Sequence, residues 1–240
     1  TSYEFYIMSI KNHIPNTITC CNLISGCIAT CMAFYSEWDK ALLFIVIGAV
    51  FDFFDGMSAR LLGVSSPIGK ELDSLADDIT FGFAPSAILF DYLYCQVEGM
   101  GGLYSLLPYV AFVMAAFSAL RLAKFNLDER QTTSFIGVPT PANALFWGSL
   151  IVGSGKVIEA LPYSIYVVVA AIFFTSYLLI AEIPLFALKF KHWGWRGNEV
   201  KYIFILSCIP LLLLLQVSGI AVIIAWYVVL SLFTNINKKK

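Results

Sequence analysis

Residues 41–62 read ALLFIVIGAVFDFFDGMSARLL, and this stretch decides the class of fold. An apolar run of this length is long enough to cross a bilayer, because a spanning helix needs about 20 residues. The run nevertheless contains Asp52 and Asp55. A charge in the middle of a bilayer costs at least about 2.5–3.5 kcal/mol, so acidic residues in such a helix indicate a function or a partner.

Apolar stretches of similar length recur along the whole chain. The chain is 59% hydrophobic and only 13% charged, whereas a soluble domain carries about 25% charged residues. A soluble protein with an unusually large core is the alternative, but the repeated span lengths favour a membrane protein. We therefore predict an all-α integral membrane fold with eight transmembrane helices, near residues 17–36, 41–62, 70–94, 103–125, 139–156, 162–184, 200–215 and 217–235.

Residues 1–240 are predicted to form a single membrane domain, since no long linker, low-complexity tract or internal repeat interrupts them. For residues 1–13, a short interfacial helix and a disordered start are both compatible with the sequence. The six cysteines lie in or at the ends of apolar segments and form no C-x-x-C pair, so neither a disulfide framework nor zinc is indicated. No nucleic-acid-binding motif is evident.

The basic residues predict the orientation of the chain in the membrane. With eight spans both termini share one side, and Lys40 and Lys156 are the two basic residues on the other side. The positive-inside rule therefore places both termini and the basic side in the cytoplasm. The cytoplasmic set comprises Lys11, Arg60, Lys70, Arg121, Lys124, Arg130, Lys189, Lys191, Arg196, Lys201 and the three lysines 238–240.

Four aspartates on the second and third predicted helices have a helical spacing. Asp52 and Asp55 are three residues apart, and Asp73 and Asp77 are four apart, so each pair shares a helix face. The short loop 63–67 joins the two helices, and their antiparallel packing can aim all four carboxylates at one point. Asp77 lies about 10 Å along the third helix from its start, which recesses the site from the cytoplasmic surface.

Four like charges in a small volume repel one another, and a hard divalent cation resolves this conflict. Carboxylate ligands suit magnesium, manganese or calcium, and neither His13 nor His192 lies nearby to favour zinc. Two alternatives remain from the residues alone. The aspartates either pair with Arg60, Lys70 and Arg121, or mark the ion pathway of a transporter.

Residues 52–77 form one string, DFFDGMSARLLGVSSPIGKELDSLAD, that matches D-x-x-D-G-x-x-A-R-x8-G-x-x-x-D-x-x-x-D without departure. This pattern resembles the signature of the CDP-alcohol phosphatidyltransferases, and it falls across two predicted membrane helices, as that family requires. The matching positions are Asp52, Asp55, Gly56, Ala59, Arg60, Gly69, Asp73 and Asp77.

Five shorter stretches resemble the phosphatidylserine synthase branch of that family. They are IPNTITCCN at 14–22, ELDSLADDITFGFAPS at 71–86, RLAKFN at 121–126, GVPTPANA at 137–144 and IPLFALKFK at 183–191. The resemblance implies an enzyme that transfers a phosphatidyl group from CDP-diacylglycerol to the hydroxyl of L-serine, giving phosphatidylserine and CMP. It also implies a six-helix core with two extra C-terminal helices, and a homodimer in the cytoplasmic (inner) membrane.

The resemblance assigns roles to the signature residues. One or two Mg or Mn ions would be held by Asp52, Asp55, Asp73 and Asp77, and Asp77 would also be the general base. Residues expected to bind the CDP-lipid are Asp55, Gly56, Ala59, Arg60, Gly69, Asn16 and Thr19. Close helix packing is the alternative for Gly56 and Ala59, contact with headgroups for Arg60, and helix capping for Asn16 and Thr19.

The serine site is predicted at the cytoplasmic end of the fourth span, from Arg121, Lys124 and Asn126. A cation there would hold the serine carboxylate or the lipid phosphate, and positive-inside anchoring is the alternative. Asp78 lies outside the signature and is expected to be a supporting or structural group.

Two other functions compete with serine transfer. A relative acting on glycerol phosphate or inositol phosphate would need extra basic residues beside the site. A cation transporter would use the same aspartates, but the chain lacks an obvious inverted repeat or broken-helix pair.

Overall fold

The computed structural model describes residues 10–128, 135–186, 194–195 and 198–238, and nearly all of them are helical. The helices are α1 (Ile10–Phe34), α2 (Trp38–Leu62), α3 (Pro67–Asp77), α4 (Ala84–Val97), α5 (Phe112–Leu127), α6 (Thr140–Glu159), α7 (Ser164–Ile180), α8 (Glu199–Leu215) and α9 (Val217–Lys238). A π-helical turn, η1 (Asp78–Phe83), joins α3 to α4, and a 3-10 segment, η2 (Gly102–Ala111), leads into α5. Two short strands, β1 (Phe135–Ile136) and β2 (Pro184–Leu185), pair antiparallel with Phe135 opposite Leu185.

The predicted all-α membrane fold is confirmed, and each predicted span corresponds to one helical rod of the described chain. The third span is the continuous rod α3–η1–α4, and the fourth is η2–α5. Within the described residues, four helices are long and apolar enough to cross a membrane: His13–Phe34, Trp38–Leu62, Gly102–Leu127 and Val217–Thr234. Residues 10–13 belong to α1, whereas residues 1–9 of the expected interfacial segment lie outside the described residues.

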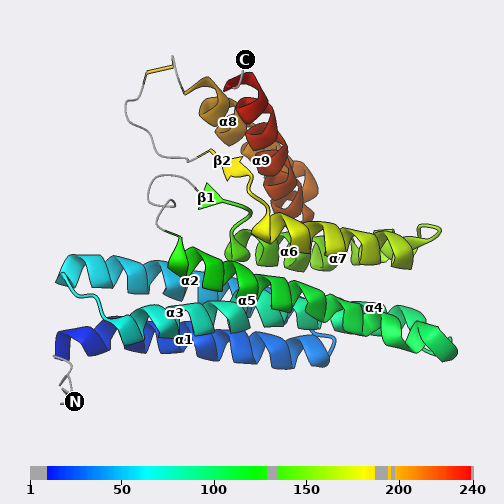
Figure 1. Ribbon diagram of the computed structural model, residues 1–240. Helices are drawn as coiled ribbons and strands as arrows, with labels where there is room; N and C mark the ends of the chain where they lie inside the picture. Colours follow the sequence, from blue (N-terminus) through cyan, green and yellow to red (C-terminus); the bar gives the residue numbers. More distant parts are fainter. Residues whose placement is uncertain (1–9, 129–134, 187–193, 196–197, 239–240) are drawn as a thin grey trace.

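The first six rods form one bundle, and the last two lie against its side. Figure 1 shows the α3–η1–α4 rod between α1 and α5, with the start of α1, the α2–α3 loop and the end of α5 at the same end. Helices α8 and α9 run beside each other, steeply inclined to the bundle (Figure 1). Helix α9 is attached to α6 by a 2.7 Å hydrogen bond between the Ser154 and Ser218 hydroxyls, and to the β2 segment by a bond from the Tyr227 hydroxyl to the Phe186 carbonyl.

The sequence analysis did not predict the π-helical turn in the third rod. Pro85 has no N–H to donate to a carbonyl one turn earlier, and its ring crowds that carbonyl. The backbone before Pro85 therefore takes the wider turn of η1. Such turns are rare and often lie at functional sites, and this one begins directly after Asp77.

Glycines let η1 approach both α1 and α2 closely. A Cβ added to Gly26 of α1 would stand 2.8 Å from the Thr80 Cα, and one added to Gly48 of α2 would stand 2.5 Å from the Thr80 Cγ2. The Thr80 hydroxyl donates a 3.0 Å hydrogen bond to the Asn22 carbonyl. Small residues permit such close helix contacts in membranes, and here they bring α1 together with the two rods that carry the signature aspartates.

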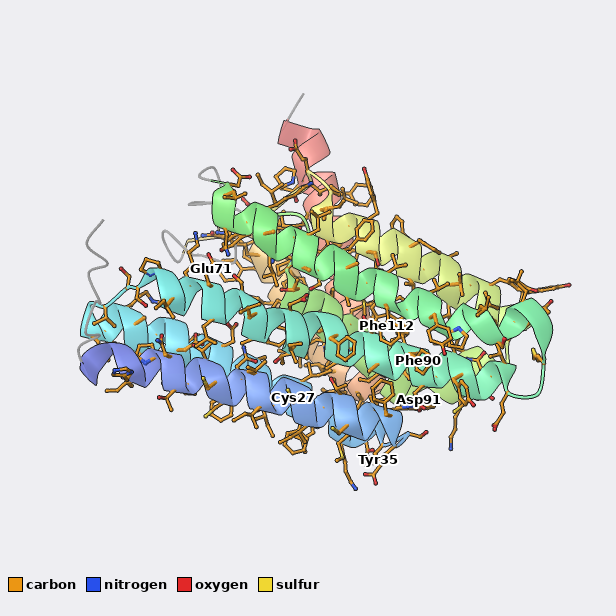
Figure 2. The ribbon with its side chains drawn as sticks, turned by 60° about the horizontal axis from the view of Figure 1, so that its bottom comes forward. Cys27, Tyr35, Glu71, Phe90, Asp91 and Phe112 are labelled. Carbon is orange, nitrogen blue, oxygen red and sulfur yellow. The ribbon has the colours of Figure 1, made fainter. Side chains whose placement is uncertain are left out.

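The two ends of the third rod differ in chemistry. Figure 2 shows Glu71 on α3 near the loop end, and Asp91 near the opposite end of the same rod. Phe90 of α4 and Phe112 of α5 lie side by side close to Asp91, with ring centroids 5.3 Å apart. The Asp91 carboxylate accepts a 2.8 Å hydrogen bond from the Trp38 indole. Apolar packing thus separates this far end from the acidic cluster.

Candidate active site

The α2–α3 loop reverses the direction of the chain between the two helices that carry the signature aspartates. Gly63 ends α2 in the left-handed conformation, with φ of 63°, where glycine carries no Cβ penalty. Ser66 then caps α3 by accepting a 2.9 Å hydrogen bond from the Gly69 N–H, and Pro67 occupies the first helical turn. The predicted short loop at 63–67 is therefore present. The two helices do not pack directly on each other as expected; both pack against α1, and their acidic side chains meet.

Three of the four signature aspartates converge. Asp52 and Asp55 of α2 and Asp73 of α3 each offer a carboxylate oxygen, and these three oxygens lie within 4.8 Å of one another. Asp55 is buried, and its Oδ2 accepts a 2.7 Å hydrogen bond from the Thr19 hydroxyl of α1. An all-oxygen set of this kind can bind a hard divalent cation.

Asp77 lies next to this three-carboxylate cluster without joining it. Its Oδ1 accepts a 3.1 Å hydrogen bond from the Asn22 side-chain amide of α1. The Asp77 carboxylate is still close enough to Asp52 and Asp73 for their charges to interact. The structure therefore separates three grouped carboxylates from a fourth that a neutral amide orients.

A cavity of about 340 Å³ opens beside the cluster, between the start of α1, the end of α2 and the start of α3. Of the residues predicted to bind the CDP-lipid, all but Arg60 line it. Arg60 is exposed, and its guanidinium lies on the Gly56 side of α2. The lining residues are Pro15, Asn16, Thr19, Asp55, Gly56, Ala59, Val64, Ser65, Ser66, Gly69, Lys70 and Asp73.

Sequence reasoning missed three polar residues of this cavity wall, Ser65, Ser66 and Lys70. Lys70 was expected as part of the basic cytoplasmic side, but it lines the cavity, and its ammonium donates a 2.8 Å hydrogen bond to the Asn126 carbonyl. Its position directly after Gly69, within the signature, could have indicated that Lys70 lines the cavity. Asn22 was also missed, because its contact with Asp77 joins residues far apart in the chain.

The residues predicted to bind serine lie in two places. Arg121 and Lys124 line a second, smaller cavity of about 50 Å³ with Leu179 and Glu182. Asn126 instead faces α3, where its side-chain amide donates a 2.8 Å hydrogen bond to the Ser74 hydroxyl. Arg121 is buried, with 8% of its surface exposed, and its charge interacts with that of Asp77. Arg121 is thus the member of the predicted set that faces the acidic site.

Ion pairing does not explain the three-carboxylate cluster. Within the described residues, Asp52, Asp55 and Asp73 form no salt bridge with an arginine or lysine; the ion pair found there joins Lys40 to Glu37 at the other end of the bundle. Uncompensated carboxylates that share a face this closely repel one another, so the arrangement suits a bound cation better than a structural role.

Fold and site together define an all-α membrane protein with a carboxylate site that can bind a metal ion. Residues 12–177 match the family model described as CDP-alcohol phosphatidyltransferase. The chain belongs to this family. The match ends within α7, the sixth rod, so the conserved core excludes α8 and α9, as the resemblance implied.

Relatives from three groups of organisms are similar to the chain, and each is named CDP-diacylglycerol–serine O-phosphatidyltransferase. The Bacillus subtilis protein is 35% identical over 188 residues, which cover 78% of this chain and 95% of that protein. The Saccharomyces cerevisiae protein is 34% identical, over 69% of this chain and 64% of its own length. The Methanocaldococcus jannaschii protein is 33% identical, over 61% of this chain and 62% of its own length.

Proposed function

We propose that this protein transfers a phosphatidyl group from CDP-diacylglycerol to the hydroxyl of L-serine, giving phosphatidylserine and CMP. The observation that carries the proposal is the meeting of three signature carboxylates within 4.8 Å beside a cavity that Gly56, Ala59 and Gly69 of the signature also line. The names of the relatives supply the acceptor.

Asp52, Asp55 and Asp73 are the residues that hold the divalent ion, Mg or Mn, with Asp77 beside them. When bound, the ion neutralises charge on the diphosphate and on the departing CMP. Thr19 keeps Asp55 oriented through its 2.7 Å hydrogen bond. Such hydrogen bonds behind a metal ligand raise metal affinity, so α1 contributes to the site without supplying a carboxylate.

The donor nucleotide occupies the cavity beside the cluster. Gly56 and Ala59 offer no bulk there, and Gly69 lies where a Cβ would stand 3.0 Å from both the Asn16 Oδ1 and the Ser66 Oγ. Lys70 supplies a positive charge from the cavity wall, and Arg60 adds another at its exposed edge. Phe53 and Phe54 are exposed beside the aspartates on α2, which gives the acyl chains an apolar surface continuous with the bilayer.

The transfer itself requires an oriented base. The serine hydroxyl oxygen attacks the phosphorus on the lipid side of the diphosphate, the bond from that phosphorus to the CMP oxygen breaks, and the hydroxyl proton passes to Asp77. Asn22 donates to the Asp77 Oδ1 and leaves the other oxygen available for this proton. Arg121, with Lys124 beside it at the wall of the smaller cavity, holds the serine carboxylate, whereas Asn126 faces α3.

The site lies at the bundle end that carries the α2–α3 loop, which we assign to the cytoplasmic face of the inner membrane together with both termini. This placement lets serine enter from water and the CDP-lipid from the bilayer. A homodimer is proposed from the family resemblance.

A CMP-release assay tests the acceptor. Purified protein in detergent or vesicles is given CDP-diacylglycerol, added Mg or Mn, and one of three acceptors: L-serine, glycerol 3-phosphate or inositol phosphate. We expect CMP release, with phosphatidylserine as the lipid product, only with serine. Release with a phosphorylated acceptor alone would contradict the serine assignment. Cation flux in liposomes without CDP-lipid turnover would favour the transporter alternative.

A further inference from the structure

The turn η1 sets the Asp78 carboxylate against α5, next to the proposed base. Gly82 lies four residues further along η1, directly against this helix. A Cβ added there would stand 2.7 Å from the Asp78 Oδ1 and 2.9 Å from the Ser118 Oγ. The Asp78 and Ser118 oxygens therefore both lie against Gly82, and a larger residue at position 82 would displace them.

Both oxygens are buried and lack a hydrogen-bond partner among the described residues. Ser118 is 1% exposed, so its hydroxyl is not satisfied by bulk solvent in the absence of a bound ligand. Buried polar groups are nearly always hydrogen-bonded, because leaving them unpaired costs free energy. The Asp78 carboxylate oxygen can only accept a hydrogen bond, whereas the Ser118 hydroxyl can donate or accept one. A cationic N–H group can donate to both oxygens, and a cation is the donor best matched to a carboxylate.

Arg121 continues the same face of α5 one turn beyond Ser118. Its guanidinium is buried, its Nε has no partner among the described residues, and its charge interacts with that of Asp77. This region thus holds the buried Asp78 and Ser118 oxygens, then the buried Arg121 guanidinium, with the proposed base Asp77 close by. The three match the ammonium, carboxylate and hydroxyl groups of a zwitterionic hydroxy amino acid.

We propose that the Asp78 carboxylate and the Ser118 hydroxyl bind the ammonium group of the acceptor and thereby select an amino acid over acceptors without an amine. This inference rests on the proposed function, and it assigns to Asp78 a substrate contact where a structural role was expected. Glycerol phosphate and inositol phosphate have no ammonium group, so they leave the buried Asp78 Oδ1 without a partner, which disfavours their binding.

Asp78→Asn tests the proposal with two acceptors that differ only in the amine, L-serine and 3-hydroxypropionate. The variant is expected to raise the KM for serine by about 10- to 100-fold, the range of a lost hydrogen bond to a charged group, with the KM for CDP-diacylglycerol unchanged. The preference for serine over 3-hydroxypropionate, measured as the ratio of kcat/KM values, is expected to fall by about the same factor. Ser118→Ala is expected to raise the serine KM by about 2- to 10-fold.

Asp91→Asn is the matched control, because Asp91 is a buried aspartate of the same rod whose Trp38 hydrogen bond an asparagine can still accept. This variant is expected to leave the KM for serine and the preference for serine over 3-hydroxypropionate unchanged. Thermal unfolding in detergent checks that each variant is folded. If the Asp78→Asn protein does not fold, the Ser118→Ala protein is used to test the proposal instead. An unchanged serine preference in folded Asp78→Asn or Ser118→Ala protein would overturn this inference alone. A wild-type protein that does not use serine would overturn the proposed function as well.

Discussion

Replacing Thr19 by valine tests whether α1 supports the metal site. The substitution keeps the β-branched shape and the volume of the side chain but removes the hydroxyl that donates to Asp55. The same hydroxyl also lies 3.1 Å from the Pro15 carbonyl, but the Asp55 oxygen is closer, at 2.7 Å, and charged. The single hydroxyl hydrogen therefore goes to the carboxylate.

The expected loss follows from burial. Thr19 is 3% exposed and Asp55 6% exposed, so solvent does not replace the lost hydrogen bond. A hydrogen bond to a charged group contributes about 1.5–3 kcal/mol. That range is consistent with the roughly 10- to 100-fold loss of metal affinity seen when a supporting partner of a ligand is removed. We expect the metal concentration for half-maximal CMP release to rise by about this factor, with kcat at saturating metal nearly retained.

Thr17→Val is the matched control. Thr17 lies on the same helix, is exposed, and donates to the His13 carbonyl without contacting the site. Thr19→Ser keeps the hydroxyl and is expected to restore the wild-type metal dependence. If Thr19→Val titrates with metal as the wild type does, or if Thr17→Val shows the same shift, the hydrogen bond to Asp55 does not support metal binding.

Three further predictions concern the base, the metal and the helix packing. Asp77→Asn is expected to lower kcat by about 10²- to 10⁴-fold, the usual contribution of a general base, while CDP-diacylglycerol still binds in a filter or calorimetric assay; wild-type turnover would refute its role. Chelation with EDTA is expected to abolish CMP release, and added Mg or Mn to restore it, whereas activity that persists after dialysis against chelator would exclude a metal requirement. Gly26→Ala is expected to destabilise the fold by about 1–3 kcal/mol, because its Cβ would stand 2.8 Å from the Thr80 Cα. Thermal unfolding would show this as a lower Tm, and an unchanged Tm would mean that α1 and η1 can separate without loss.

Helical periodicity was enough to predict much of the site. Asp52 and Asp55 share a face of α2 because they are three residues apart, and the short loop reverses the chain so that Asp73 of α3 can meet them. The hydrophobic lengths likewise predicted the helical rods. These properties depend on residues close together in the chain, so no knowledge of packing was needed.

Only the tertiary structure decided which groups join the cluster and which stand beside it. Asp77 has the correct helical spacing, yet the Asn22 amide of α1 holds it outside the group of three. Arg121 and Asn126 are five residues apart and so point to different faces of α5 by helical periodicity alone, but only the packing shows that one face meets the smaller cavity and the other meets α3. Distances between helices depend on side-chain volume where the helices touch, here on Gly26, Gly48 and Thr80, and no local pattern in the sequence specifies which residues touch.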